Sequence, residues 1–223
     1  MHYNFEAEWE SLGIAFIKEG SRDVNPEQAL INFVTNCCPV KNKQEYARVL
    51  GWLSLFSKYV FVGRLKKMCP NLNAEDLSRL GAISEYQVQN GDFRFSMICD
   101  YVKKRNGSNI SFECIEKENF LKLKGEDEVF KEYGITVAKM RIESKEKYIP
   151  LEYIIQKNNW IKNRLRYGVN LRADVCTELT LDPNRSSYSI AKKLGFSPHS
   201  TKKIFDDFQL LETLDWGTST RLL

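Results

Sequence analysis

Histidine is scarce in this sequence, which holds only His2 and His199 among its 223 residues. A serine or cysteine nucleophile that needs a histidine base therefore has almost no candidate partner. The sequence also lacks a glycine-rich phosphate loop, a G-x-S-x-G motif and an H-E-x-x-H motif. We therefore expect a protein that is not an enzyme and that needs no cofactor.

Closely spaced cysteine pairs of the C-x-x-C type are also absent, although the chain has six cysteines. A structural zinc site needs four convergent ligands, usually in such pairs, so we expect no metal site. Six cysteines could form disulfides, but reduced and buried thiols are the expectation here. The adjacent Cys37 and Cys38 could instead sense oxidation. The six cysteines are Cys37, Cys38, Cys69, Cys99, Cys114 and Cys176.

Long apolar runs are missing, since no window approaches the 18 or so uninterrupted apolar residues of a membrane span. The N-terminus has no basic segment followed by an apolar run, so we expect no secretion signal. Hydrophobic residues make up 43% of the chain and charged residues 28%, which is typical of a globular protein with a core. A cytoplasmic protein without membrane association is the expectation.

Apolar residues recur at helical spacing through residues 1–105. Asn25-Pro26 and Asn73 are typical first residues of helices, and Asn106-Gly107 is a typical end. We therefore expect a mainly helical N-terminal domain over residues 1–147. Its aromatic residues Trp52, Phe56, Tyr59 and Phe61 could line a ligand pocket, but core packing is the preferred interpretation. The apolar stripes are Phe5/Trp9/Leu12/Phe16, Leu30/Phe33/Val34, Tyr46/Val49/Leu50/Leu53/Phe56/Val60, Leu77/Leu80/Ile83 and Phe95/Ile98/Val102.

The pattern changes between residues 109 and 147, the last part of that domain. Ile110, Phe112 and Cys114 alternate with polar residues, and this period of two predicts a strand. Ile135 and Val137 suggest another strand, and 126–133 a short charged helix. We expect a small β connector here.

A second domain is expected over residues 148–223. Pro150 opens a predicted helix whose apolar side holds Ile154, Ile155, Ile161 and Leu165. Its other side carries Lys157, Lys162, Arg164 and Arg166, which form either a solvated face or a border to a phosphate backbone. From Trp160 onward, 10 lysines and arginines face 7 acidic residues, a net +3 of the chain's total of +4. This charge asymmetry favours a polyanionic partner.

Three further helices are expected in this domain. Leu171, Val175 and Leu179 form the apolar stripe of the first, which should end before residues 182–184. Ser186-Ser187 can cap the second, which runs to Leu194, and Ser197-Pro198 can open the third.

The turn between the last two helices has the residues that a sharp bend requires. A small residue such as Ala191 permits close approach of the helices, and Gly195 can adopt a left-handed conformation. Thr201 is expected to point back toward the core. Ile204, Phe205, Phe208 and Leu211 should continue the buried face.

The segment Ser189–Ile204, with sequence SIAKKLGFSPHSTKKI, resembles the helix-turn-helix of winged-helix regulators of the MarR and ArsR type. The resemblance covers only the C-terminal part of the chain, from about Arg166 to Leu223. It implies a winged helix-turn-helix fold and binding of double-stranded DNA, with a role in transcription regulation. The implied β wing would span Thr213 to Leu223, with a turn at Gly217–Ser219.

The resemblance also implies a set of DNA-binding residues. The helix that begins at Ser197 would enter the major groove and read base edges, the preceding helix would meet phosphates, and the wing would add contacts. Ser197, His199, Ser200, Lys202 and Lys203 are implied on the recognition helix, Arg185, Ser187 and Tyr188 at the start of the preceding helix, and Thr218 and Arg221 on the wing.

Some residues depart from that pattern. Asp206 and Asp207 place negative charge midway along the predicted recognition helix, and no arginine lies on its early face. His199, Lys202 and Lys203 could equally be a solvated surface. The alternative is therefore a protein-interaction module, such as an antitoxin, an adaptor or a replication accessory protein. Winged-helix regulators of the MarR and ArsR type are often dimers, so we expect a homodimer as well.

Overall fold

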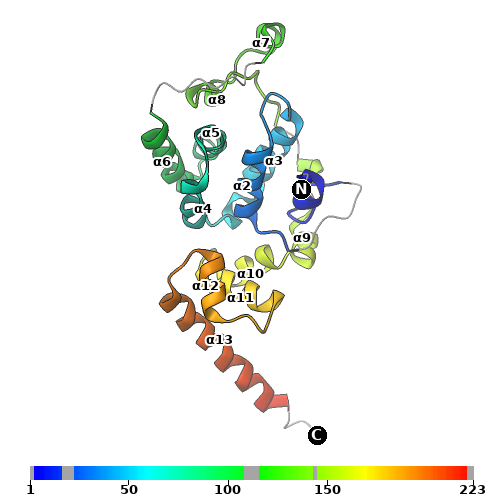
Figure 1. Cartoon of the computed structure of the whole chain (residues 1–223). Coiled ribbons are helices and arrows are strands. Elements are labelled where there is room, and N and C mark those ends of the chain that lie inside the picture. Colours follow the sequence, from blue (N-terminus) through cyan, green and yellow to red (C-terminus); the bar gives the residue numbers. More distant parts are fainter. Residues whose placement is uncertain (1–2, 17–22, 108–115, 143–144, 220–223) are drawn as a thin grey trace. The chain divides into compact units, whose positions relative to one another are not determined.

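The computed structural model describes residues 3–16, 23–107, 116–142 and 145–219, with side chains up to residue 211 (Figure 1). The chain forms two compact units, 1–158 and 159–223, hereafter the N-terminal and the C-terminal unit. Both consist mainly of helices, so the expected fold class is confirmed at that level.

Most helices of the N-terminal unit begin near the predicted positions, but the first ends at Glu10 although its predicted stripe reached Phe16, and the helices at Val62–Met68 and Glu118–Lys124 were not predicted. The predicted third helix ends at Phe56 rather than near Val60, because a short 3-10 helix follows it. The helices are α1 (Phe5–Glu10), α2 (Pro26–Asn36), α3 (Lys43–Phe56), α4 (Val62–Met68), α5 (Ala74–Gln89), α6 (Ser96–Asn106), α7 (Glu118–Lys124), α8 (Glu128–Glu132) and α9 (Leu151–Lys157), with 3-10 helices at Ser57–Tyr59, Cys69–Asn71, Phe93–Phe95 and Lys145–Lys147.

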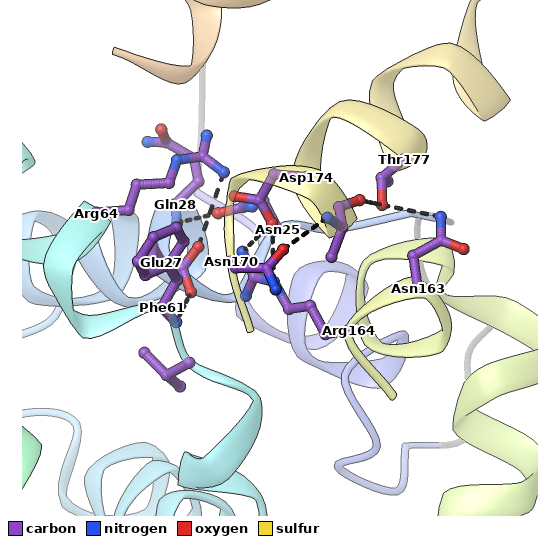
Figure 2. Close-up of polar contacts among 12 residues, drawn as sticks. Asn25, Glu27, Gln28, Phe61, Arg64, Asn163, Arg164, Asn170, Asp174 and Thr177 are labelled. Atoms are coloured by element: carbon purple, nitrogen blue, oxygen red, sulfur yellow. Dashed lines mark hydrogen bonds and ion pairs between the residues drawn. The ribbon is translucent and has the colours of Figure 1, made fainter. Parts of the chain in front are cut away.

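Asparagine caps begin two of these helices, as predicted. The Asn25 side chain accepts a hydrogen bond from the Gln28 amide at 3.0 Å, and Pro26 occupies the first position of α2 (Figure 2). Asn73 accepts from the Asp76 amide at 2.8 Å and starts α5. Each cap satisfies an N–H group that has no partner within its helix.

An aromatic cluster fills the core of the N-terminal unit. Trp9 and Trp52 are fully buried, and their ring centroids lie 5.5 Å apart. The Trp52 indole N–H donates to the Leu12 carbonyl at 2.6 Å, which satisfies the polar edge of a buried ring. Tyr59 is also buried, and Phe56 and Phe61 are half-buried. These aromatic residues therefore contribute to packing, which was the interpretation preferred over a ligand pocket.

Buried charges in this unit are satisfied by backbone groups and by opposite charges. Glu27 is fully buried, accepts from the Phe61 amide at 2.7 Å, and lies 3.8 Å from an Arg64 nitrogen (Figure 2). Arg79 donates to the Val34 carbonyl at 2.8 Å. A buried charge without such partners would be strongly destabilising.

The predicted β connector is wrong where the structure describes it. Over residues 116–142 the chain forms α7, α8 and irregular segments, and its β structure is limited to an isolated bridge between Glu126 and Ala138. Glu116 holds this segment, because its carboxylate accepts from the Ala138 amide at 2.7 Å and pairs with Lys43. The predicted strand at Ile110–Cys114 lies outside the described residues.

The predicted helix after Pro150 is two helices. Asn158 is extended, with φ −126° and ψ 106°, and separates α9 from α10 (Asn159–Tyr167). Its side-chain amide donates to the Val24 carbonyl at 2.9 Å, which anchors this residue to the N-terminal unit. The two compact units divide after Asn158.

The cysteines do not all match the expectation of reduced, buried thiols. Cys37, Cys69 and Cys99 are free and buried, and burial raises the pKa of the Cys37 thiol to about 12. Cys176 is free and half-buried, whereas Cys38 is disulfide-bonded. Cys114 lies outside the described residues. In the part of the chain that the structure describes, no cluster of metal-ligating side chains was found.

The C-terminal unit consists of α10 and three further helices around a small apolar core. The fully or almost fully buried residues of this core are Trp160, Val175, Ile190 and Leu194, against which Leu171, Leu179, Phe196, Ile204, Phe205 and Phe208 pack. The predicted stripe of residues 204, 205 and 208 is confirmed, but Leu211 is 50% exposed. The helices after α10 are α11 (Leu171–Leu181), α12 (Ser187–Leu194) and α13 (Pro198–Ser219).

A buried ion pair joins α10 to α11. Arg164 Nε and Nη2 donate to Asp174 Oδ1 at 3.0 and 2.9 Å, and both side chains are fully buried (Figure 2). The prediction that Arg164 belongs to a solvated or phosphate-facing side is therefore wrong, and Leu165 is 51% exposed instead. Asn163 donates to Thr177 at 3.0 Å beside this pair, which adds a second polar link between the two helices.

The predicted β wing is also wrong within the described residues. α13 runs without interruption to Ser219 and extends beyond α10, α11 and α12 in Figure 1. Thr213 to Ser219 are therefore helical, including the predicted turn at Gly217–Ser219. Residues 220–223 lie outside the described residues. Among the helices that the structure describes, none has the length and apolar character needed to cross a membrane.

We predict that replacing only one member of the buried ion pair strongly destabilises the C-terminal unit. Arg164→Met should cost about 3–5 kcal/mol, because it leaves the Asp174 carboxylate buried without its cation. Hydrogen exchange of the α11 amides measures this loss within the C-terminal unit. The double variant R164M/D174L is the matched control and should recover most of the loss. A mild effect of R164M would show that Asp174 does not depend on this cation.

Candidate functional site

Helix α12 begins with a serine cap and buries one face. Ser186 accepts a hydrogen bond from the Ser189 amide at 3.2 Å, and Ile190, Ala191 and Leu194 are buried. On the other side, Tyr188 is 67% exposed, and Lys192, one turn later, is exposed as well. The sequence predicted the cap and the small buried residue 191 correctly.

The turn after α12 depends on a left-handed residue. Gly195 has φ +69° and ψ 31°, and its N–H donates to the Ala191 carbonyl. The Phe196 N–H donates to the same carbonyl at 3.1 Å, so two amide groups close the helix end. L-residues adopt this conformation at a cost that glycine avoids. Only residues 195–197 separate α12 from α13, so the chain turns sharply here.

The first turn of α13 places some side chains outward and others inward. Ser197 Oγ accepts from the Ser200 amide at 3.1 Å, while the Ser197 hydroxyl donates to Ser200 Oγ at 3.0 Å. Thr201 is fully buried, as predicted. His199 and Ser200 are exposed, and so is Lys203 one turn after His199. The exposed face therefore offers an imidazole, a hydroxyl and an ammonium group.

Several cations of the C-terminal unit are held by carboxylates. Glu178 of α11 is fully buried and pairs with both Arg185 and Lys193, the latter at 2.9 Å. On α13, Lys202 Nζ lies 2.9 and 3.0 Å from the two carboxylate oxygens of Asp206. Each of these cations therefore has a carboxylate partner, although the side chains of Lys193 and Lys202 remain 50% and 65% exposed.

Two lysines near the turn are exposed and have no ion pair within the described residues. They are Lys192 on α12 and Lys203 on α13. The sequence interpretation included Lys203 but missed Lys192. Its position four residues after Tyr188 on the exposed side of α12 is a signal that could have identified it.

The ten predicted DNA-binding residues thus do not form one set. Four of them are exposed and lie near the turn in the sequence, namely Tyr188, His199, Ser200 and Lys203. Ser187, the first residue of α12, is half-buried. Ser197 contributes a helix cap, and Arg185 and Lys202 are in ion pairs. Thr218 lies on α13 rather than on a wing, and Arg221 lies outside the described residues.

We predict that Gly195→Ala destabilises the C-terminal unit by about 1 kcal/mol, because alanine must adopt a positive φ there. A Cβ atom at this position would meet no atom within 4 Å, so the cost is conformational and not steric. Gly195→Asn is the matched control and should lose less, since asparagine tolerates this conformation better. Urea unfolding followed by circular dichroism measures both. Equal stability of G195A and the wild type would contradict the role of this turn.

Comparison with known proteins adds no assignment to this geometry. No family model matches the chain, and neither a curated protein nor a solved structure matches it.

Proposed function

We propose that the C-terminal unit is a helix-turn-helix module that binds double-stranded DNA, with the first turn of α13 in the major groove. The observation that carries this proposal is the three-residue turn at Gly195, after which α13 begins with an exposed outer face and a buried inner face. A helix that presents its first turn in this way has the arrangement that reads base edges in such modules.

The chemistry of the exposed face supports a nucleic-acid ligand. Lysine and serine side chains can donate to base edges or to phosphate oxygens, and histidine can donate through its ring nitrogens. Lys192 and Lys203 have no carboxylate partner within the described residues, so their charge is open to phosphates. Since few open cations lie near the turn, we expect modest affinity for random duplex and a shallow salt dependence.

Transcription regulation by a homodimer is the biological role that this module would serve. Two copies would present two first turns of α13 to two half-sites, separated by about 34 Å or one turn of the DNA helix. Dimerisation increases specificity, because one copy has few groups that can read bases.

A protein-interaction module is the second candidate, and exposed leucines favour it. Leu210 and Leu211 on α13 are 61% and 50% exposed, so two consecutive large apolar side chains are accessible to a partner. If this segment binds a partner protein, α13 serves for docking and the unit need not bind DNA.

We predict that Lys203→Glu and Lys192→Glu each weaken binding of the full chain to random duplex DNA by at least about tenfold at about 50 mM salt. The reason is that each loses one phosphate contact and the counterion released with it. Fluorescence anisotropy of a labelled duplex measures the affinity. Lys104→Glu is the control, because Lys104 of α6 in the N-terminal unit is exposed and has no ion pair among the described residues, and the change in net charge is the same.

Three outcomes separate the candidates. Loss of binding in the two C-terminal variants but not in K104E supports the proposal. An equal loss in all three contradicts an interface at the turn and indicates diffuse charge attraction. No binding of the wild type at tens of micromolar protein and low salt contradicts DNA binding and favours the protein-interaction module, since non-specific DNA binders associate under those conditions.

A further inference from the structure

The charges of α13 are ordered along the helix. Its cations, Lys202 and Lys203, lie near its start, and its acidic residues follow at positions 206, 207, 212 and 215. The first turn has no acidic residue and the last turn has no basic one. Neither terminal turn of α13 therefore carries the charges that the helix dipole favours, which are anions at the N-terminus and cations at the C-terminus.

The boundary between the two charged parts is an ion pair on the helix surface. Both carboxylate oxygens of Asp206 lie within 3.0 Å of the Lys202 ammonium, one turn before it. The neighbouring Asp207 pairs with Arg172 of α11 at 2.5 Å. Lys203, in contrast, has no such partner in the described structure. Asp206 thus offsets part of the positive charge of Lys202, although the Lys202 side chain is still 65% exposed, whereas Lys203 has no such neighbouring anion.

The two parts of α13 are far apart compared with the range of electrostatic forces in salt. A helix rises 1.5 Å per residue, so position 215 lies about 18 Å along the axis from Lys203. Charges separated by more than about 8 Å are largely screened at physiological ionic strength. A duplex that meets only the first turns of α13 is therefore insensitive to the charge at position 215. A duplex lying along the whole helix is repelled by it.

We propose that duplex DNA meets α13 end-on, through its first two turns, and that Asp206 limits the affinity by holding Lys202 in an ion pair. This inference rests on the proposed function and specifies how the same site is used. The acidic second half of α13 then points away from the phosphate backbone, and removing the Asp206 charge releases one further cation for a phosphate contact.

The test compares two equal changes on the same helix, Asp206→Asn and Asp215→Asn, in the full chain with random duplex DNA. D206N should bind several-fold more tightly at about 0.1 M salt, where the screening length is about 10 Å, and the slope of log K against log salt should become steeper by about 0.9, the contribution of one released counterion. D215N should match the wild type. The gain from D206N should disappear in the double variant K202A/D206N, because the released cation is then absent.

Each outcome decides the inference. Equal gains in D206N and D215N contradict end-on binding, and a gain of D206N that persists in K202A/D206N contradicts the role of Lys202. Binding by the wild type with no effect of D206N contradicts only this inference. No binding by either protein contradicts the proposed function itself.

Discussion

The C-terminal unit depends on two carboxylates that are fully buried on α11, Asp174 and Glu178. Burial of a charge is tolerated only when opposite charges and hydrogen bonds replace its water. Arg164 therefore joins α10 to α11 through Asp174, and Arg185 and Lys193 join α12 and its preceding turn to α11 through Glu178. The apolar core fills the remaining space, and these ion pairs determine which cations have a buried carboxylate partner.

That constraint changes how the net charge of this unit must be interpreted. The excess of +3 from Trp160 onward includes the three cations bound to buried carboxylates, and Lys202 has an acidic partner on the surface. Within the described residues, Lys192 and Lys203 are therefore the exposed cations next to the turn that have no carboxylate partner. A module of this kind would recognise DNA through the shape and placement of α13 more than through overall charge.

The sequence predicted correctly those features that depend on residues close together in the chain. The caps at Asn25, Asn73 and Ser186 and the left-handed Gly195 were identified because each acts on backbone groups only a few residues away. The burial of Arg164 was missed because its partner lies ten residues later on another helix. The wing was wrong because Gly217 suggested a turn, although an established helix can continue through one glycine for about 1 kcal/mol.

Recognition of DNA by the C-terminal unit requires that the surface around the Gly195 turn contact the duplex. Amide chemical-shift changes of the isotope-labelled full chain during titration with a short duplex test it most directly. We expect the largest changes on residues 187–192 and 198–203, with small changes over 210–219 and in the N-terminal unit. Changes concentrated in 210–219, or absence of any change at saturating duplex, would contradict it.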